Sequence, residues 1–254
     1  PLRRRLNVVP EPIQAGLWGL AAASSLVAGA GAGVWLEVPR RAVALVMGFG
    51  AGALISALAF DLTAEAFAGG GTIATAVGLA AGAVTYFIGD MLLQRSARRH
   101  ATEPPRQGPI AATSGPSIVL GTLLDGLPES IVLGASILGG AGISTSLLAA
   151  IFLSNVPEGV AGGRDLSDEG HGRGWIIGLW VGVALASGLA AAIGNALLSG
   201  MDAGAVALVQ AYAGGAILTM LADTMIPEAF EDGGDWVGLA TVLGFASAFL
   251  LSRA

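Results

Sequence analysis

Residues 121–163, GTLLDGLPESIVLGASILGGAGISTSLLAAIFLSNVPEGVAGG, form two successive apolar stretches with a Pro-Glu pair in the middle of each. The pairs are Pro128-Glu129 and Pro157-Glu158. A carboxylate inside an apolar run of about 20 residues is costly, because bilayer hydrocarbon cannot solvate it. Two such pairs on adjacent apolar segments predict a ligand, and we interpret the remaining segments as a scaffold around them.

The composition is typical of an integral membrane protein. The 254 residues are 54% hydrophobic and 12% charged, whereas soluble domains are about 25% charged. No basic stripe is present, which argues against nucleic acid as a partner. The lack of cysteine excludes disulfides and thiolate metal sites. All twelve basic residues are arginine, and with the abundant alanine and glycine this favours a bacterial source.

Hydropathy predicts an all-α membrane protein with eight transmembrane helices in one compact domain, residues 1–254. Small residues four apart, Gly48 with Gly52 and Gly178 with Gly182, predict close helix packing. Segment 95–114 contains four arginines and is predicted to be a loop. The predicted spans are 13–36, 42–66, 73–94, 115–138, 142–163, 174–199, 203–227 and 236–252.

The arginine distribution predicts the orientation in the membrane. Loops after odd-numbered spans hold eight arginines, and the opposite side holds four, of which three lie in the N-terminal tail. The positive-inside bias therefore places loop 95–114 in the cytoplasm and both termini on the outside. The predicted location is the plasma membrane, or the inner membrane of a bacterium, with several passes through the lipid bilayer.

Several acidic residues lie inside the predicted spans. Asp125 and Glu129 are four residues apart and share one helix face, and Asn155 and Glu158, three apart, share another. Asp61 and Glu65 lie near the predicted outer face, whereas three further acids lie near the inner face: Asp90, Asp223 and Glu228. A series of acidic side chains is therefore expected from one side of the membrane to the other.

Salt bridges within the spans are not available to these acids, since lysine is absent and no arginine lies within a span. The carboxyl groups are either protonated and structural, or they face a hydrated path and bind a cation. Pro128 and Pro157 each remove a backbone donor and release a carbonyl one turn earlier, near Leu124 and Leu153. Released carbonyls beside carboxylates form the oxygen-rich pockets that hard cations occupy.

The two Pro-Glu segments resemble the motifs of a known family. Gly126-Leu127-Pro128-Glu129 is similar to the His-Asn-x-Pro-Glu-Gly motif of the ZIP family of zinc and iron transporters. Ser154-Asn155-Val156-Pro157-Glu158-Gly159 resembles the second motif of that family, in the next span. The resemblance covers nearly the whole chain. It implies a helical bundle with an elevator-like or rocking change of access, frequent homodimers, and entry of a divalent metal into the cytoplasm.

The resemblance also implies individual ligands. Glu129 and Glu158 match family ligands, and Asp125 stands at a His position. Gly126 stands where the family has Asn, Ala191 where it has Glu, and Leu54 replaces a Met, so a single site is expected. Because Asp125 replaces a His, no histidine lies in a span and that Met is absent, broad divalent selectivity is expected, with a weakened preference for Zn²⁺, since all-oxygen sites favour Mn²⁺, Mg²⁺, Ca²⁺ or Fe²⁺. The expected metal ligands are Asp125, Glu129, Ser154, Asn155 and Glu158, and the expected pathway residues are Asp61, Asp90, Asp223 and Glu228.

The expected function is facilitated or proton-linked transport of a divalent cation; the acids can exchange protons for metal, because coordination needs ionised carboxylates. Two alternatives remain: a proton- or sodium-coupled carrier of another solute, and a ZIP-like membrane scaffold or sensor that transports nothing. An enzyme is not expected, because Ser130 and Ser154 flank the acids but neither histidine lies in a span to act as a base. No organic cofactor is expected.

Overall fold

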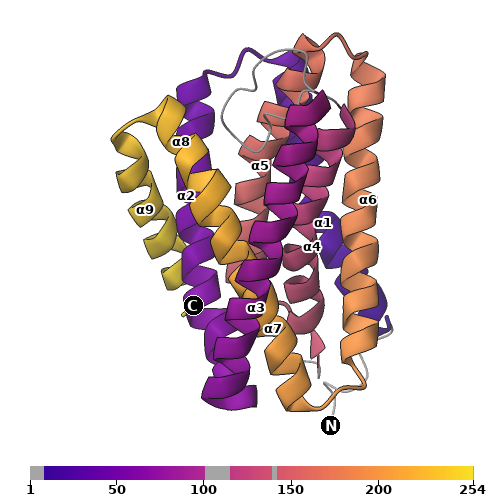
Figure 1. Ribbon diagram of the computed structural model, residues 1–254, viewed down its shortest axis with the longest axis vertical. Coiled ribbons are helices and arrows are strands. Elements are labelled where there is room, and N and C mark those ends of the chain that lie inside the picture. The colour runs from indigo at the N-terminus through magenta and orange to yellow at the C-terminus, as the bar shows by residue number, and fades with distance from the viewer. Residues whose placement is uncertain (1–8, 101–114, 139–141, 254) are drawn as a thin grey trace.

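The computed structural model describes residues 9–100, 115–138 and 142–253. Helices account for nearly all of these residues and no strand occurs among them, which confirms the all-α prediction (Figure 1). Within this part of the chain, four helical segments are long and apolar enough to cross a membrane: Glu11–Trp35, Arg40–Ser96, Arg173–Leu198 and Ala203–Gly233. The two helices that carry the Pro-Glu pairs are not among these four.

The bounds of the elements follow the predicted segments closely. The largest difference is at the boundary between the second and third predicted spans, where α2 ends at Ala57 and α3 already begins at Thr63. In addition, α3 continues to His100, so the predicted loop 95–114 begins as helix, and its part 101–114 lies outside the described residues. The elements are α1 (Glu11–Trp35), α2 (Arg40–Ala57), the π-helix η2 (Leu58–Leu62), α3 (Thr63–His100), α4 (Gly115–Ser136), α5 (Thr145–Asp168), α6 (Arg173–Leu198), α7 (Ala203–Met220), the π-helix η4 (Leu221–Met225), α8 (Ile226–Gly233) and α9 (Trp236–Leu251).

An internal repeat, which the sequence analysis missed, explains this order of elements. Residues 42–71 (AVALVMGFGAGALISALAFDLTAEAFAGGG) and 205–234 (AVALVQAYAGGAILTMLADTMIPEAFEDGG) are identical at 14 of 30 positions without a gap. In both copies a π-helix begins at the same position, Leu58 and Leu221. Both copies end at a glycine with positive φ, Gly71 at 69° and Gly234 at 60°. Only glycine adopts such a conformation readily, so it is the residue expected at a sharp turn.

The two copies run in opposite directions through the bundle. In Figure 1, α2 descends from the upper end and α7 ascends from the lower end. The contacts are exchanged accordingly, since α2 packs on α9 and α7 packs on α3. A Cβ added to Gly52 would overlap the carbonyl oxygen of Thr241, and one added to the equivalent Gly215 would overlap that of Leu79. These are the features of an inverted-topology repeat related by a pseudo-two-fold axis.

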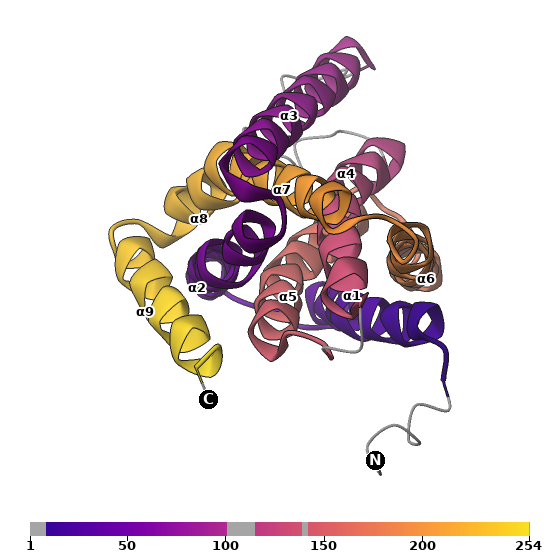
Figure 2. The same cartoon turned by 90° about the horizontal axis from the view of Figure 1, so that it is seen from below.

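The pseudo-two-fold also relates α4 to α5. The contact of α1 with α5 has its counterpart in that of α6 with α4, and the contact of α2 with α5 in that of α7 with α4. Seen from below, α1, α4, α5 and α6 form one group, and α2, α3, α7, α8 and α9 form a second (Figure 2). The Pro-Glu pairs therefore lie near the axis, where the two groups meet.

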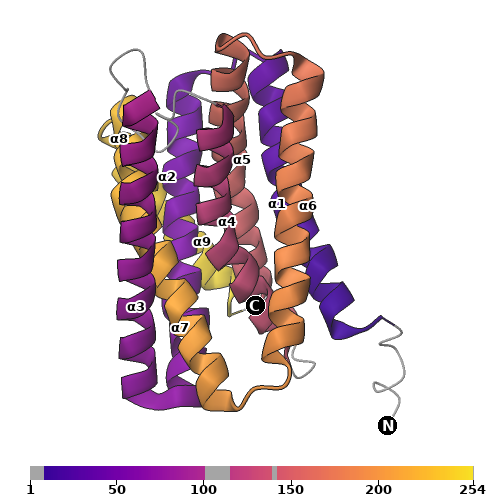
Figure 3. The ribbon, with the colours of Figure 1, turned by 45° about the vertical axis from the view of Figure 1, so that its right-hand side comes forward.

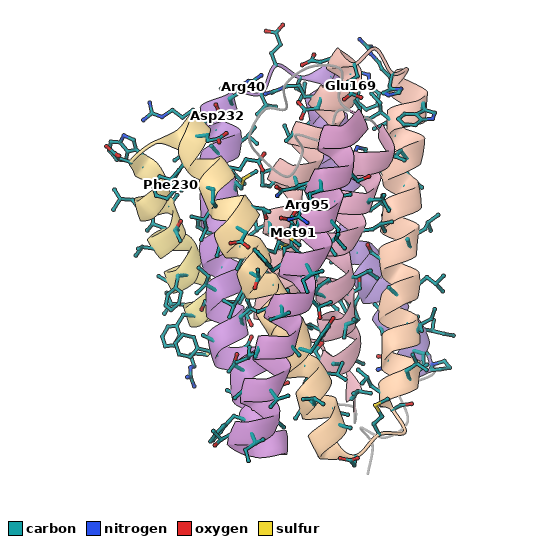
Figure 4. The ribbon with its side chains drawn as sticks, viewed as in Figure 1. Arg40, Met91, Arg95, Glu169, Phe230 and Asp232 are labelled. Carbon is teal, nitrogen blue, oxygen red and sulfur yellow. The ribbon has the colours of Figure 1, made fainter. Side chains whose placement is uncertain are left out.

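The helix connections are divided between the two ends of the bundle. The α1–α2, α5–α6 and α8–α9 connections lie at the upper end, and the α6–α7 connection and the bend between α2 and α3 lie at the lower end (Figure 3). Charged residues mark the upper end, among them Arg40, Glu169 and Asp232 (Figure 4). In the described structure α1 starts at the lower end, and α9 descends toward it.

Close packing by small residues is confirmed for one of the two predicted pairs. Gly48 and Gly52 lie against Val237 and Thr241 of α9, where a Cβ would overlap them. The prediction for Gly178 and Gly182 is wrong, because a Cβ at either position would have no atom within 4 Å. These two glycines lie on the outer surface of α6 instead.

Candidate functional site

Helices α4 and α5 bring the two Pro-Glu pairs into the middle of the bundle. Pro128 and Pro157 are buried, and each helix continues across its proline as one element. The N-terminus of α5 is capped by Ser144, whose side chain accepts a hydrogen bond from the Leu147 backbone N–H over 3.2 Å. Because α4 and α5 are antiparallel, Glu129 and Glu158 approach from opposite directions. Glu129 is 5% exposed.

A pocket, here called the α8-side pocket, lies between α4, α5 and the second copy of the repeat. Its empty volume is about 550 Å³, which includes space open to solvent. Four carboxylates line it, those of Asp125, Glu129, Glu158 and Glu228. The other lining residues are Met47, Gly121, Thr122, Ser154, Met220, Thr224 and Met225.

A second and smaller pocket, here called the α1-side pocket, lies on the other side of the α4–α5 pair. Its empty volume is about 290 Å³, which includes space open to solvent, and it reaches α1 and α6 through residues such as Gly19 and Ser187. Glu129, Glu158 and Thr122 line both pockets. No arginine, lysine or histidine is among the described residues lining either pocket. The two glutamates therefore lie between two spaces with no cationic side chain to balance them.

The structure divides the five predicted metal ligands between these spaces. Asp125 and Glu129 line the α8-side pocket together, as their shared helix face predicts. Ser154 also lines that pocket, whereas Asn155 lines the α1-side pocket. Consecutive residues of an α-helix point about 100° apart, which allows Ser154 and Asn155 to face different spaces. Glu158 is the residue of α5 that reaches both.

The acidic side chains are close enough to interact with one another. Glu158 interacts electrostatically with Asp125, Glu129 and Glu228, and its carboxylate accepts a hydrogen bond from the Thr122 hydroxyl. Among the described residues, however, no three acidic or histidine side chains converge tightly enough to hold an ion. The carboxylates line the walls of the pocket and face its interior from several helices.

Tyr86 is a functional candidate that the sequence analysis missed. It is 3% exposed, and its hydroxyl donates a hydrogen bond to Asp125 Oδ1 over 2.5 Å. The same hydroxyl is hydrogen-bonded to Thr224 of η4. One oxygen of Asp125 is thus held from α3. A weak signal was present in the sequence, because Tyr86 is one of only two tyrosines and lies one turn before Asp90.

Of the predicted pathway residues, Glu228 lines the α8-side pocket, and the other three lie elsewhere. Asp90 accepts a hydrogen bond from Gln94 Nε2 over 2.7 Å and lies close to the exposed Asp223. These two acids lie beside the pocket, on α3 and η4. Asp90 is near enough to Asp125 for their charges to interact.

Asp61 lies at the lower end of the bundle. Its Oδ2 accepts hydrogen bonds from Ser144 Oγ, over 2.9 Å, and from Ser146 Oγ. One turn further along α3, Glu65 accepts a hydrogen bond from Gln210 Nε2 over 3.2 Å. Apolar packing separates this polar group from the central acids: the buried side chains of Ala57, Leu62, Ala150 and Ile151 belong to one core cluster. The two copies of the repeat are therefore similar in sequence, but a pocket reaches the central acids from the upper side only, whereas the lower side is packed.

The family departure at Ala191 has a packing explanation. Ala191 is fully buried between α6, α1 and α4. A Cβ added to Gly19 would lie 2.8 Å from the Ala191 Cβ, and one added to Gly134 would lie 2.6 Å from the Ala191 carbonyl oxygen. A glutamate side chain at this position would have no room. The expected loss of a second metal site remains a prediction, with this packing as its structural support.

Comparison with known proteins places the chain in no family. No protein-family model matches the sequence, and no curated protein is significantly similar to it.

Proposed function

We propose that this chain is a ZIP-like carrier that moves a divalent metal ion, Zn²⁺, Fe²⁺, Mn²⁺ or a similar cation, across the plasma or inner membrane toward the cytoplasm. The observation that carries the proposal is the position of Glu129 and Glu158. They approach from antiparallel helices near a pseudo-two-fold axis, line two pockets, and have no cationic residue among the lining of either. Uncompensated acids inside an apolar bundle are the usual mark of an ion pathway.

The inverted repeat supports a carrier over a rigid scaffold. Many secondary transporters are built from inverted repeats with the substrate site at the repeat interface, and alternate access by movement of one helix group against the other. Here the interface lies between the group α1, α4, α5, α6 and the group α2, α3, α7, α8, α9. In the proposed membrane arrangement, eight spans cross the bilayer, both termini are outside, and the upper end of Figure 1 faces the cytoplasm.

The asymmetry of the two sides supports an inward-facing state. The α8-side pocket is lined by Met47 and Gly121, in the upper halves of α2 and α4, and by Glu228 on α8, in the upper part of the continuous α7–η4–α8 segment. The equivalent space below the acids is filled by the buried side chains of Ala57 and Leu62. A metal released from Glu129 and Glu158 would therefore leave past Glu228. Asp61 would accept the next ion only after Ser144 and Ser146 have separated from it.

Metal uptake into proteoliposomes tests the proposal. Wild-type protein is expected to accumulate Mn²⁺ or Zn²⁺, and Glu129→Gln and Glu158→Gln are each expected to abolish uptake while the protein stays folded. Glu37→Gln is the matched control, because Glu37 is an exposed glutamate between α1 and α2. Full uptake by both central variants would refute the proposal. Proton- or sodium-driven uptake of another solute would favour the coupled carrier. A protein that folds and keeps its partners but takes up nothing would favour the scaffold or sensor.

A further inference from the structure

The α8-side pocket contains a group of methionines that the proposed divalent site does not use. Met47, Met220 and Met225 all line it, each from a different element, α2, α7 and η4. They are three of the five methionines of the chain. Met47 is 4% exposed and Met220 is 5% exposed. Met225 packs against the core cluster that contains Met220 and against the cluster that contains Met47, so it lies between the two.

Methionine often fills irregular gaps in a core, and the internal repeat provides a test of that explanation. The positions equivalent to Met220 and Met225 are Ala57 and Leu62, which are 1% and 3% exposed. Packing at these positions of the repeat is therefore possible without sulfur. Yet in two copies that are identical at 14 of 30 positions, all three methionine positions differ, and the methionine lies on the pocket side each time.

The third position shows what the exchange changes chemically. The counterpart of Met47 is Gln210, which donates a hydrogen bond to Glu65 at the closed lower end. Glu228, the counterpart of Glu65, lines the pocket together with Met47, whose thioether has no hydrogen to donate. At the lower end the Gln210 amide donates a hydrogen bond to the Glu65 carboxylate, whereas in the pocket the equivalent position is Met47, whose sulfur can only accept. The pocket side thereby offers lone pairs of sulfur and oxygen together.

We propose that Met47, Met220 and Met225 form a thioether site in the α8-side pocket for a soft monovalent cation, Cu(I), with the pocket carboxylates balancing its charge. Thioether sulfur selects Cu(I) among the biological metals, whereas carboxylates alone favour harder ions. A thioether carries no proton to lose, so it binds metal without deprotonation. The inference rests on the proposed function in taking this pocket as a cation site, and it extends the substrate class beyond divalent ions.

The first test is Ag(I) binding, with Ag(I) as the redox-inert probe for Cu(I), by purified untagged protein in detergent. The triple variant Met47→Leu, Met220→Leu, Met225→Leu keeps a similar side-chain volume. It is expected to lose affinity for Ag(I) by roughly tenfold or more, while it still unfolds cooperatively as wild type does. The matched control is Met91→Leu with Met201→Leu, which removes the other two methionines and is expected to bind Ag(I) as wild type does.

X-ray absorption on Cu(I)-loaded wild-type protein is the second measurement, and it needs no variant. Since the chain has no cysteine, any sulfur neighbour of the metal must come from methionine. Sulfur neighbours are expected. Only oxygen or nitrogen neighbours, or a triple variant that binds Ag(I) like wild type, would overturn the thioether site. If the thioether site is overturned in this way but Glu129→Gln still loses Mn²⁺ uptake, the proposed divalent transport stands. A failure of the thioether site can therefore be told apart from a failure of the proposed function.

Discussion

Tyr86→Phe tests whether Asp125 is held ready for a cation. The substitution keeps the buried ring and removes only the hydroxyl that donates to Asp125 Oδ1 over 2.5 Å. A hydrogen bond to a charged group contributes about 1.5–3 kcal/mol, which corresponds to roughly 10- to 100-fold in an equilibrium constant. Loss of such supporting contacts around a metal site commonly weakens metal affinity by a similar factor of about 10–100. We therefore expect Mn²⁺ affinity to fall within that range.

Isothermal titration of purified protein with Mn²⁺ measures this change directly. Tyr212→Phe is the matched control, because Tyr212 is the only other tyrosine and lies on α7, where it lines neither pocket. Tyr212→Phe is expected to bind as wild type does, and both variants are expected to unfold cooperatively. The reasoning is refuted if Tyr86→Phe keeps wild-type affinity, or if Tyr212→Phe loses as much.

Two further predictions concern packing. Gly215→Val should destabilise the protein by several kcal/mol, because the new Cβ would overlap the Leu79 carbonyl oxygen. Gly182→Val should have little effect, because a Cβ at that position has no atom within 4 Å. Thermal unfolding in detergent compares the two variants, and equal melting temperatures would contradict the packing described. Ala191→Glu should lower the melting temperature and add no second bound metal, because Ala191 is fully buried against Gly19; a stable variant that binds two ions would show that room for the ligand exists.

The helices were predictable because their signals are local. Apolar runs of spanning length, turn residues between them and the Pro-Glu pairs all lie within short windows of sequence. The repeat was equally available from the sequence, since AVALV occurs at both 42–46 and 205–209. Aligning the chain with itself pairs Leu58 with Leu221 and Gly71 with Gly234, so a break in the helix at one position is expected at its counterpart as well.

The contents of the site were less predictable, because they depend on contacts between distant segments. Tyr86 reaches Asp125 across 39 residues of sequence. Ser154 and Asn155 are neighbours in the chain, yet they line different pockets, and helical periodicity alone does not say which face meets which space. The expectation of a site poor in soft ligands rests on Asp125 at a His position, on the absence of histidine from the spans and on Leu54, whereas the methionines of the pocket lie at other positions.

The stoichiometry of divalent metal binding tests the central claim most directly. Equilibrium dialysis of the untagged protein against Mn²⁺, followed by metal analysis, compares wild type with the double variant Glu129→Gln, Glu158→Gln. The account predicts one ion per wild-type chain and none in the double variant at the same free metal concentration. A double variant that retains one tightly bound ion would show that these two glutamates do not hold the cation.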